Sequence, residues 1–127
     1  MPASAKLFLS MGSLLALAAV VIGAFGTHGL KARLSPEMLA VYQTGVQYHF
    51  YHALGLVLVG LAFFHLPESA ALRASGWLMA AGILLFSGSL YVLALTGEKW
   101  LGAVAPLGGT AFILGWGAFA WAVLRTP

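Results

Sequence analysis

Charged residues are rare in this chain, and their positions leave four long uncharged stretches. The sequence has six basic and three acidic residues, and the intervals without them are 7–30, 38–67, 74–97 and 100–124. A helix that crosses a bilayer needs about 20 mainly apolar residues, because about 30 Å of hydrocarbon must be spanned with every backbone group bonded internally. All four stretches are long enough. The sequence therefore predicts an all-α integral membrane four-helix bundle, formed by one four-span transmembrane domain over residues 1–127.

The composition and the charge distribution limit the class of protein further. An apolar fraction of 61% leaves too little polar surface to cover a soluble globule. The basic residues are spread over both ends and the loops, which predicts contact with phospholipid headgroups and no nucleic-acid site. They divide equally between the two expected sides of the membrane, so the positive-inside rule leaves the orientation open. The chain has no cysteine, which excludes disulfides and thiolate chemistry.

Turn and cap residues give the expected bounds of the spans. We expect helices at about 7–25, 50–66 and 74–95, and a fourth span that is opened by Pro106-Leu107-Gly108-Gly109. An even number of spans places both termini on one side. Ser35-Pro36-Glu37 is typical of a helix start, because serine caps, proline suits the first helical position and glutamate favours the positive dipole end.

The stretch from 36 to 66 is too long for a single crossing. A continuous helix there would exceed the bilayer thickness, so the 38–48 portion is expected to lie in the headgroup zone or to break near Gly45. The prediction therefore includes a short interfacial helical segment between spans one and two.

Small residues recur at helical spacing in the first and last spans. Such stripes let two backbones approach closely, so we expect them to face other helices or a second protomer instead of lipid. The first stripe is Gly12, Ala16, Ala19 and Gly23, and the second is Ala111, Gly115, Ala118 and Ala122.

Two histidines three residues apart are the strongest candidates for chemistry. His49 and His52 share a helix face, with Tyr48 beside them, and Gln43, Gln47 and Tyr51 form a second polar face. Metals usually need three or four donors, and a dihaem bundle needs axial histidines on two helices at matching depths. The sequence has no such pattern, so we expect no metal site and no cofactor.

The sequence also offers little for catalysis. It contains no aspartate, and its three glutamates fall in loops or at interfaces. Ser87 and Ser89 have no adjacent acid or base, so Ser-His-Asp chemistry is excluded in its usual form, and we expect these serines to bond a neighbouring helix or a backbone carbonyl. We therefore predict a non-enzymatic protein with no catalytic residue.

Several short motifs resemble those of a small membrane-protein family. They are Gly23-Ala24-Phe25-Gly26-Thr27-His28-Gly29-Leu30, Tyr48-His49-Phe50-Tyr51-His52-Ala53-Leu54, Gly88-Ser89-Leu90-Tyr91, Pro106-Leu107-Gly108-Gly109 and Gly115-Trp116. In this order they are similar to the motifs of domain of unknown function 423, of the YgdD type, and the resemblance covers nearly the whole chain. It implies a multi-pass protein of the bacterial inner (plasma) membrane, and it implies no activity.

These observations predict a non-enzymatic accessory subunit or a homo-oligomeric membrane organiser. Its partners would be membrane lipid and either other membrane subunits or further copies of the chain. A channel or carrier for a small solute is the alternative. Counting crossings brings the motif residues to one membrane face, where we expect a site for a ligand or partner, or a lock between helix ends. The candidates are His28, His49, His52, Tyr48, Tyr91, Pro106, Gly108 and Gly109.

Overall fold

The computed structural model describes residues 1–67 and 69–127, and the regular structure of these residues is entirely helical. Four long helical stretches follow one another along the chain. The third consists of two α-helices joined without a break by a π-helix, and the first ends in another π-helix. In order, the elements are α1 (Ala3–Phe25) with η1 (Gly26–Leu30), α2 (Pro36–Ala62), α3 (Ala70–Gly82) with η2 (Ile83–Ser87) and α4 (Gly88–Thr96), and α5 (Leu101–Leu124).

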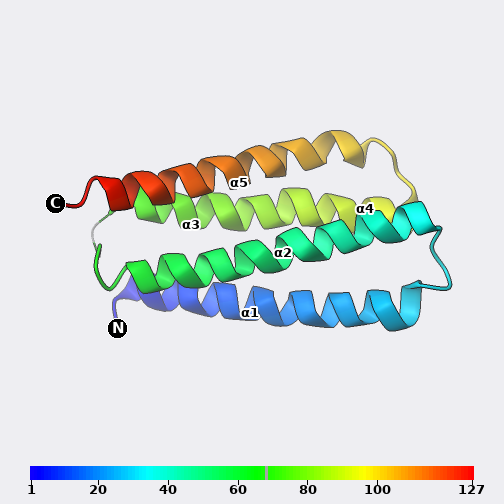
Figure 1. Ribbon diagram of the computed structural model, residues 1–127, viewed down its shortest axis with the longest axis horizontal. Coiled ribbons are helices and arrows are strands. Elements are labelled where there is room, and N and C mark those ends of the chain that lie inside the picture. Colours follow the sequence, from blue (N-terminus) through cyan, green and yellow to red (C-terminus); the bar gives the residue numbers. More distant parts are fainter. Residues whose placement is uncertain (68) are drawn as a thin grey trace.

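The four stretches run side by side, and both termini lie at the same end of the molecule (Figure 1). Three of them are long and apolar enough to cross a membrane: Ala3–Leu30, Ala70–Thr96 and Leu101–Leu124. The remaining stretch, α2, carries more polar residues and packs against α1 on one side and against α3 and α4 on the other (Figure 1). The all-α prediction is therefore confirmed, whereas the interfacial segment between the first two spans stays a prediction.

Side-chain caps and one glycine fix the ends of the helices. The Ser35 hydroxyl accepts a hydrogen bond from the Met38 N–H at 3.1 Å, with Pro36 in the first helical position. The Ser69 hydroxyl caps α3 in the same way by accepting from the Leu72 N–H. Gly97 ends α4 with a φ of 75°, a left-handed conformation that glycine adopts without strain.

The predicted break near Gly45 is wrong, because α2 runs without interruption from Pro36 to Ala62. Gly45 allows a neighbouring helix to pack closely against α2 and does not bend α2. A Cβ atom there would lie 2.8 Å from the Tyr91 ring, and the Gly45 carbonyl accepts a hydrogen bond from the Ser87 hydroxyl at 2.7 Å. The missing side chain thus lets α4 approach α2.

The predicted start of the last span at Pro106 is also wrong, because α5 begins at Leu101 and contains Pro106. Its first turn is held by i→i−3 backbone bonds from residues 101–103 to the carbonyls of residues 98–100. Proline removes one backbone donor, and a position close to the helix start tolerates that loss better than the centre does.

Both small-residue stripes face neighbouring helices, as predicted. A Cβ atom on Gly12 would lie 2.7 Å from the Ala53 carbonyl oxygen, so α1 and α2 are in backbone contact. Gly60 makes the reciprocal approach, 2.8 Å from the Leu9 nitrogen. In α5, Gly115 packs on Met79 of α3. Helix pairs α1–α2 and α3–α5 are therefore joined through small residues.

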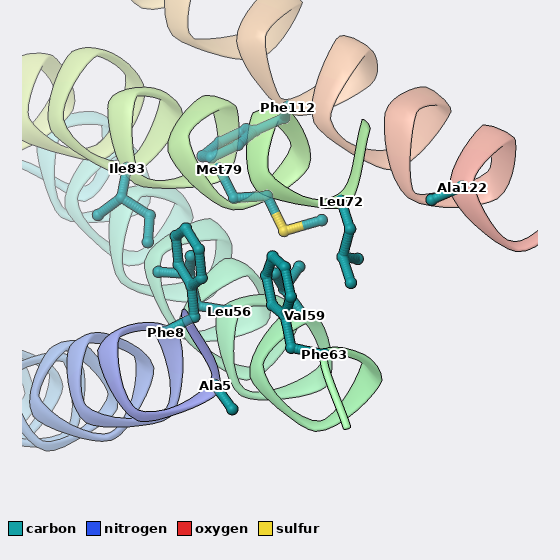
Figure 2. Packing of buried hydrophobic residues seen from close by; sticks show 10 residues of the cluster. All are labelled: Ala5, Phe8, Leu56, Val59, Phe63, Leu72, Met79, Ile83, Phe112 and Ala122. Atoms are coloured by element: carbon teal, nitrogen blue, oxygen red, sulfur yellow. The ribbon is translucent and has the colours of Figure 1, made fainter. Parts of the chain in front are cut away.

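The largest apolar cluster fills the half of the molecule nearest the termini. Phe8 stacks on Phe63 with ring centroids 5.7 Å apart, and Leu56, Leu72 and Met79 surround them (Figure 2). All five of these side chains are fully buried. The interior of this half is thus closed, and the polar groups of α2 lie beyond it toward the other end.

Candidate functional site

A cavity of about 570 Å³ lies between α2, η2 and α5. We call it the aromatic pocket, because most of its wall is made of flat rings. Its size falls within the usual range for small-molecule sites, about 300–1,000 Å³. The lining residues are Tyr48 and His52 of α2, Phe86 of η2, and Pro106, Gly109, Thr110, Phe112, Ile113 and Trp116 of α5.

His52 is fixed in the wall by two hydrogen bonds and one stacked ring. Its Nδ1 lies 2.7 Å from the Tyr48 carbonyl oxygen, and its Nε2 lies 3.0 Å from the Trp116 indole nitrogen. A carbonyl only accepts and an indole N–H only donates, so Nδ1 carries the proton and Nε2 the lone pair. The imidazole also stacks on Phe112, with ring centroids 3.5 Å apart and planes at 9°.

This arrangement decides what His52 can do. Both ring nitrogens are occupied, so the side chain has no free lone pair for a metal or for an incoming proton. Among residues 1–67 and 69–127, no three His, Asp or Glu side chains gather closely enough to hold a metal ion. His52 therefore shapes the pocket and orients Trp116 and Phe112.

The π-helix η2 contributes one residue to the wall of the pocket. A π turn holds more residues than an α turn and changes the direction of the side chains on either side of it. Here Phe86 lines the pocket, and the next residue, Ser87, is fully buried and donates its hydroxyl hydrogen to α2. Gly108 allows α5 to reach this turn, because a Cβ atom there would lie 2.3 Å from the Phe86 nitrogen.

The aromatic pocket brings together half of the predicted site residues. Tyr48, His52, Pro106 and Gly109 all line it. His52 lies about 24 Å along α2 from Pro36, so the pocket reaches the middle of the molecule. Whether these residues bind a ligand or a partner stays a prediction.

The other four predicted residues lie outside the lining. Gly108 contacts the backbone of Phe86 behind the wall. His28 is exposed in η1. His49 and Tyr91 form a separate pair, with Nδ1 2.8 Å from the phenolic oxygen.

The His49–Tyr91 pair belongs to a polar network that joins α1, α2 and α4 in the half of the molecule that contains the 31–35 loop. Tyr91 packs against Tyr42, whose hydroxyl donates to the Ile22 carbonyl of α1 at 2.5 Å. His49 is only 4% exposed. The network joins helices, and whether it acts as the predicted lock between helix ends or as part of a binding site stays a prediction.

Five lining residues were not predicted: Phe86, Thr110, Phe112, Ile113 and Trp116. Most of them could have been predicted if the last helix had been expected to begin at Leu101 instead of Pro106. Pro106, Gly109, Thr110, Ile113 and Trp116 then follow helical spacing and share one face. Phe86 carries no such signal, since its position depends on the π turn.

The hydrogen bond from Trp116 to His52 gives a testable prediction. Replacing Trp116 with Phe keeps a ring in the wall but leaves the buried Nε2 of His52 without a donor, which we expect to cost about 1–3 kcal/mol of stability. Thermal unfolding in detergent measures this loss, and Trp121→Phe is the control because Trp121 is exposed.

Nitrogen NMR of the wild-type histidines should show His52 protonated on Nδ1. A proton on Nε2 instead would refute the assignment.

Several known membrane proteins are similar to this chain over most of its length. The family model described as "Protein of unknown function (DUF423)" matches residues 22–109. UPF0382 membrane protein YwdK of Bacillus subtilis is 51% identical over 87% of this chain and 90% of its own length. UPF0382 membrane protein SH2409 of Staphylococcus haemolyticus is 44% identical over 87% of this chain and 89% of its own length. UPF0382 membrane protein SERP0230 of Staphylococcus epidermidis is 43% identical over 94% of this chain and 97% of its own length.

No solved structure matches the chain. The relatives are similar over nearly their whole length, and their names state a membrane location and no activity. The resemblance noted from the sequence motifs is therefore confirmed, and the chain belongs to the membrane-protein family described as protein of unknown function DUF423.

Proposed function

We propose that this chain is a non-enzymatic protein of the bacterial plasma (inner) membrane that holds a neutral, lipophilic, ring-bearing molecule in the aromatic pocket. It would do so as an accessory subunit or as a homo-oligomeric organiser. The observation that carries the proposal is the pocket itself: about 570 Å³, walled by aromatic rings and free of charged side chains.

The chemistry of the wall favours a flat, uncharged ligand. An ion would lose its hydration without gaining a counter-charge, because none of the nine lining residues is charged. Aromatic walls stack well on a planar ring. The Tyr48 hydroxyl remains free to donate a hydrogen bond to a carbonyl or ether oxygen on such a ring, since no bond from it to the described residues is present and Tyr48 is 39% exposed. A quinone-like headgroup has these properties.

The position of the pocket supports entry from the lipid phase. Ile113 at the rim is 74% exposed and Trp116 is 41% exposed, on an α5 that is apolar enough to cross a membrane. A hydrophobic molecule dissolved in the bilayer would reach these side chains by lateral diffusion. The fixed tautomer of His52 supports binding without catalysis, because neither ring nitrogen is free to exchange a proton.

The alternative of a channel or carrier stays a prediction without a specific observation in its favour. A solute path along the molecular axis would have to pass Phe8, Leu56, Phe63 and Met79, which are fully buried and pack together (Figure 2). These four residues are not part of the lining of the aromatic pocket.

Titration with decylubiquinone tests the proposal. We expect saturable quenching of tryptophan fluorescence in the purified protein, because the quinone ring would lie against Trp116. Gly109→Leu should weaken this binding at least about tenfold: a Cβ atom on Gly109 has only Phe86 Cδ2 at 3.9 Å, so the new side chain occupies the pocket without displacing backbone.

Gly117→Leu is the matched control, since Gly117 lies on the same helix with no atom within 4 Å of its would-be Cβ. It should bind as the wild type does. Decanol, which has the tail without the ring, should not compete. Equal quenching in all three proteins, or full competition by decanol, would contradict recognition of a ring in this pocket.

A further inference from the structure

A second polar feature lies on the outer surface, at the groove between α1 and α2. Gln43, Gln47 and Tyr51 follow one another at four-residue steps on α2, and all three are exposed. We call them the amide ladder. Gln47 donates a hydrogen bond from its amide nitrogen to the Tyr51 hydroxyl. The ladder borders two shallow cavities of about 340 and 310 Å³ that share Gly23, Val46 and Gln47.

The ladder lies deep along the helix. Gln47 is about 16 Å and Tyr51 about 22 Å from Pro36 on a helix about 40 Å long. A hydrocarbon core of about 30 Å centred on that helix would contain both residues well inside its boundary. The neighbouring stretch Ala3–Leu30 is itself apolar enough to span the membrane. With this placement, which differs from the headgroup position expected for 38–48, these polar groups face lipid tails if the chain is alone.

Lipid tails cannot satisfy these side chains. A glutamine amide has two N–H donors and one carbonyl acceptor, and the bond to Tyr51 uses one donor of Gln47. A polar group left without a partner in hydrocarbon is costly, and membrane helices relieve that cost by hydrogen bonding across helix interfaces. The ladder thus requires a partner that offers both donors and acceptors.

We propose that this partner is a second copy of the chain, docked ladder to ladder about a twofold axis. A primary amide is self-complementary, so two Gln47 side chains related by such an axis can each donate to and accept from the other. No charged residue lines either cavity, so two copies meet without repulsion.

The α1 side of the groove suits the same partner. Val20 and Ala24 line it and are exposed, and the small side chain of Ala24 lets a helix of the second copy approach closely. This inference names the partner in the proposed homo-oligomer and so rests on that part of the proposed function. Binding of decylubiquinone in the aromatic pocket is measured independently, so the two proposals can fail separately.

The lack of native cysteine makes the test direct, since a single introduced cysteine can form only an intermolecular disulfide. In liposomes that contain only the purified full chain, Ala24→Cys should give a disulfide-linked dimer on mild oxidation, because Ala24 is exposed at the groove. Leu84→Cys is the control. Leu84 is 73% exposed on η2, away from the groove, and should remain monomeric.

Gln47→Leu on the Ala24→Cys background tests the ladder itself. Loss of two reciprocal hydrogen bonds should weaken dimerisation about tenfold. The measurement is energy transfer between labelled copies as the protein is diluted with added lipid. Gln47→Asn retains the amide and should recover part of the association. If Ala24→Cys links no faster than Leu84→Cys, or if Gln47→Leu associates as the parent does, the second copy is not the occupant, and the groove holds lipid or a different protein.

Discussion

Gly108→Ala should be among the most damaging small substitutions in this protein. A single methyl group at this position would lie 2.3 Å from the Phe86 nitrogen and 2.7 Å from the Phe86 Cα, so it meets backbone and not a movable side chain. Overpacking of this kind typically costs about 1–3 kcal/mol and sometimes more. We expect a loss at the upper end of that range, because α5 and η2 must separate to admit the methyl group. Thermal unfolding in detergent measures the effect.

The adjacent residue supplies the control for this prediction. Gly109→Ala places its methyl group 3.9 Å from the nearest atom, Phe86 Cδ2, which is ordinary van der Waals distance. Because alanine favours a helix over glycine by about 1 kcal/mol, this variant should be as stable as the wild type or slightly more stable. Equal unfolding temperatures for the two variants would show that α5 and η2 do not touch at Gly108.

Gly12→Ala should produce the second large loss of stability. Its methyl group would lie 2.7 Å from the Ala53 carbonyl oxygen and 2.8 Å from the Val57 nitrogen, both backbone atoms of α2. We expect a cost of about 1–3 kcal/mol, since the two helices must move apart along much of their contact. Unfolding in detergent again gives the measurement.

Gly117→Ala is the matched control for Gly12, because a Cβ atom on Gly117 has open space around it. The two substitutions are chemically identical and should change stability in opposite directions. A destabilised Gly117→Ala together with a tolerant Gly12→Ala would mean that α1 does not pack on α2 through the first small-residue stripe.

The sequence predicts the helical framework well, because its strongest signals are local or periodic. Charge-free stretches identify the long helices, and Ser35 with Pro36 marks a helix start that depends only on neighbouring residues. The stripes beginning at Gly12 and Ala111 identify faces that pack on other helices, since small residues at helical spacing have few other uses in a membrane.

The errors arise where one residue type has two structural uses. A glycine can end or bend a helix, or it can admit a neighbour, and the choice at Gly45 depends on Tyr91, which is distant in sequence. Pro106 likewise suits either the first position of a helix or a site slightly further in, and the bonds from residues 101–103 to the preceding loop decide for the second.

The candidate site could be predicted only in part, for the same reason. The motif at 48–54 correctly indicated Tyr48 and His52, the two residues of α2 that line the aromatic pocket. The position of Phe86 follows from a π turn, for which the residues Ile83–Ser87 give no clear local signal. The Trp116 bond that fixes the tautomer of His52 joins residues 64 positions apart, and such pairing appears only once the helices are packed.

The molecule that co-purifies with the chain tests the central claim most directly. Protein extracted from its own membrane in a mild detergent would be subjected to solvent extraction and mass spectrometry, with Gly109→Leu and Gly117→Leu treated identically. We predict that a neutral, ring-bearing lipophilic molecule accompanies the wild type and Gly117→Leu in near-stoichiometric amount and is lost from Gly109→Leu. Identical extracts from all three proteins, or extracts that contain phospholipid alone, would contradict the assignment of the aromatic pocket as the functional site.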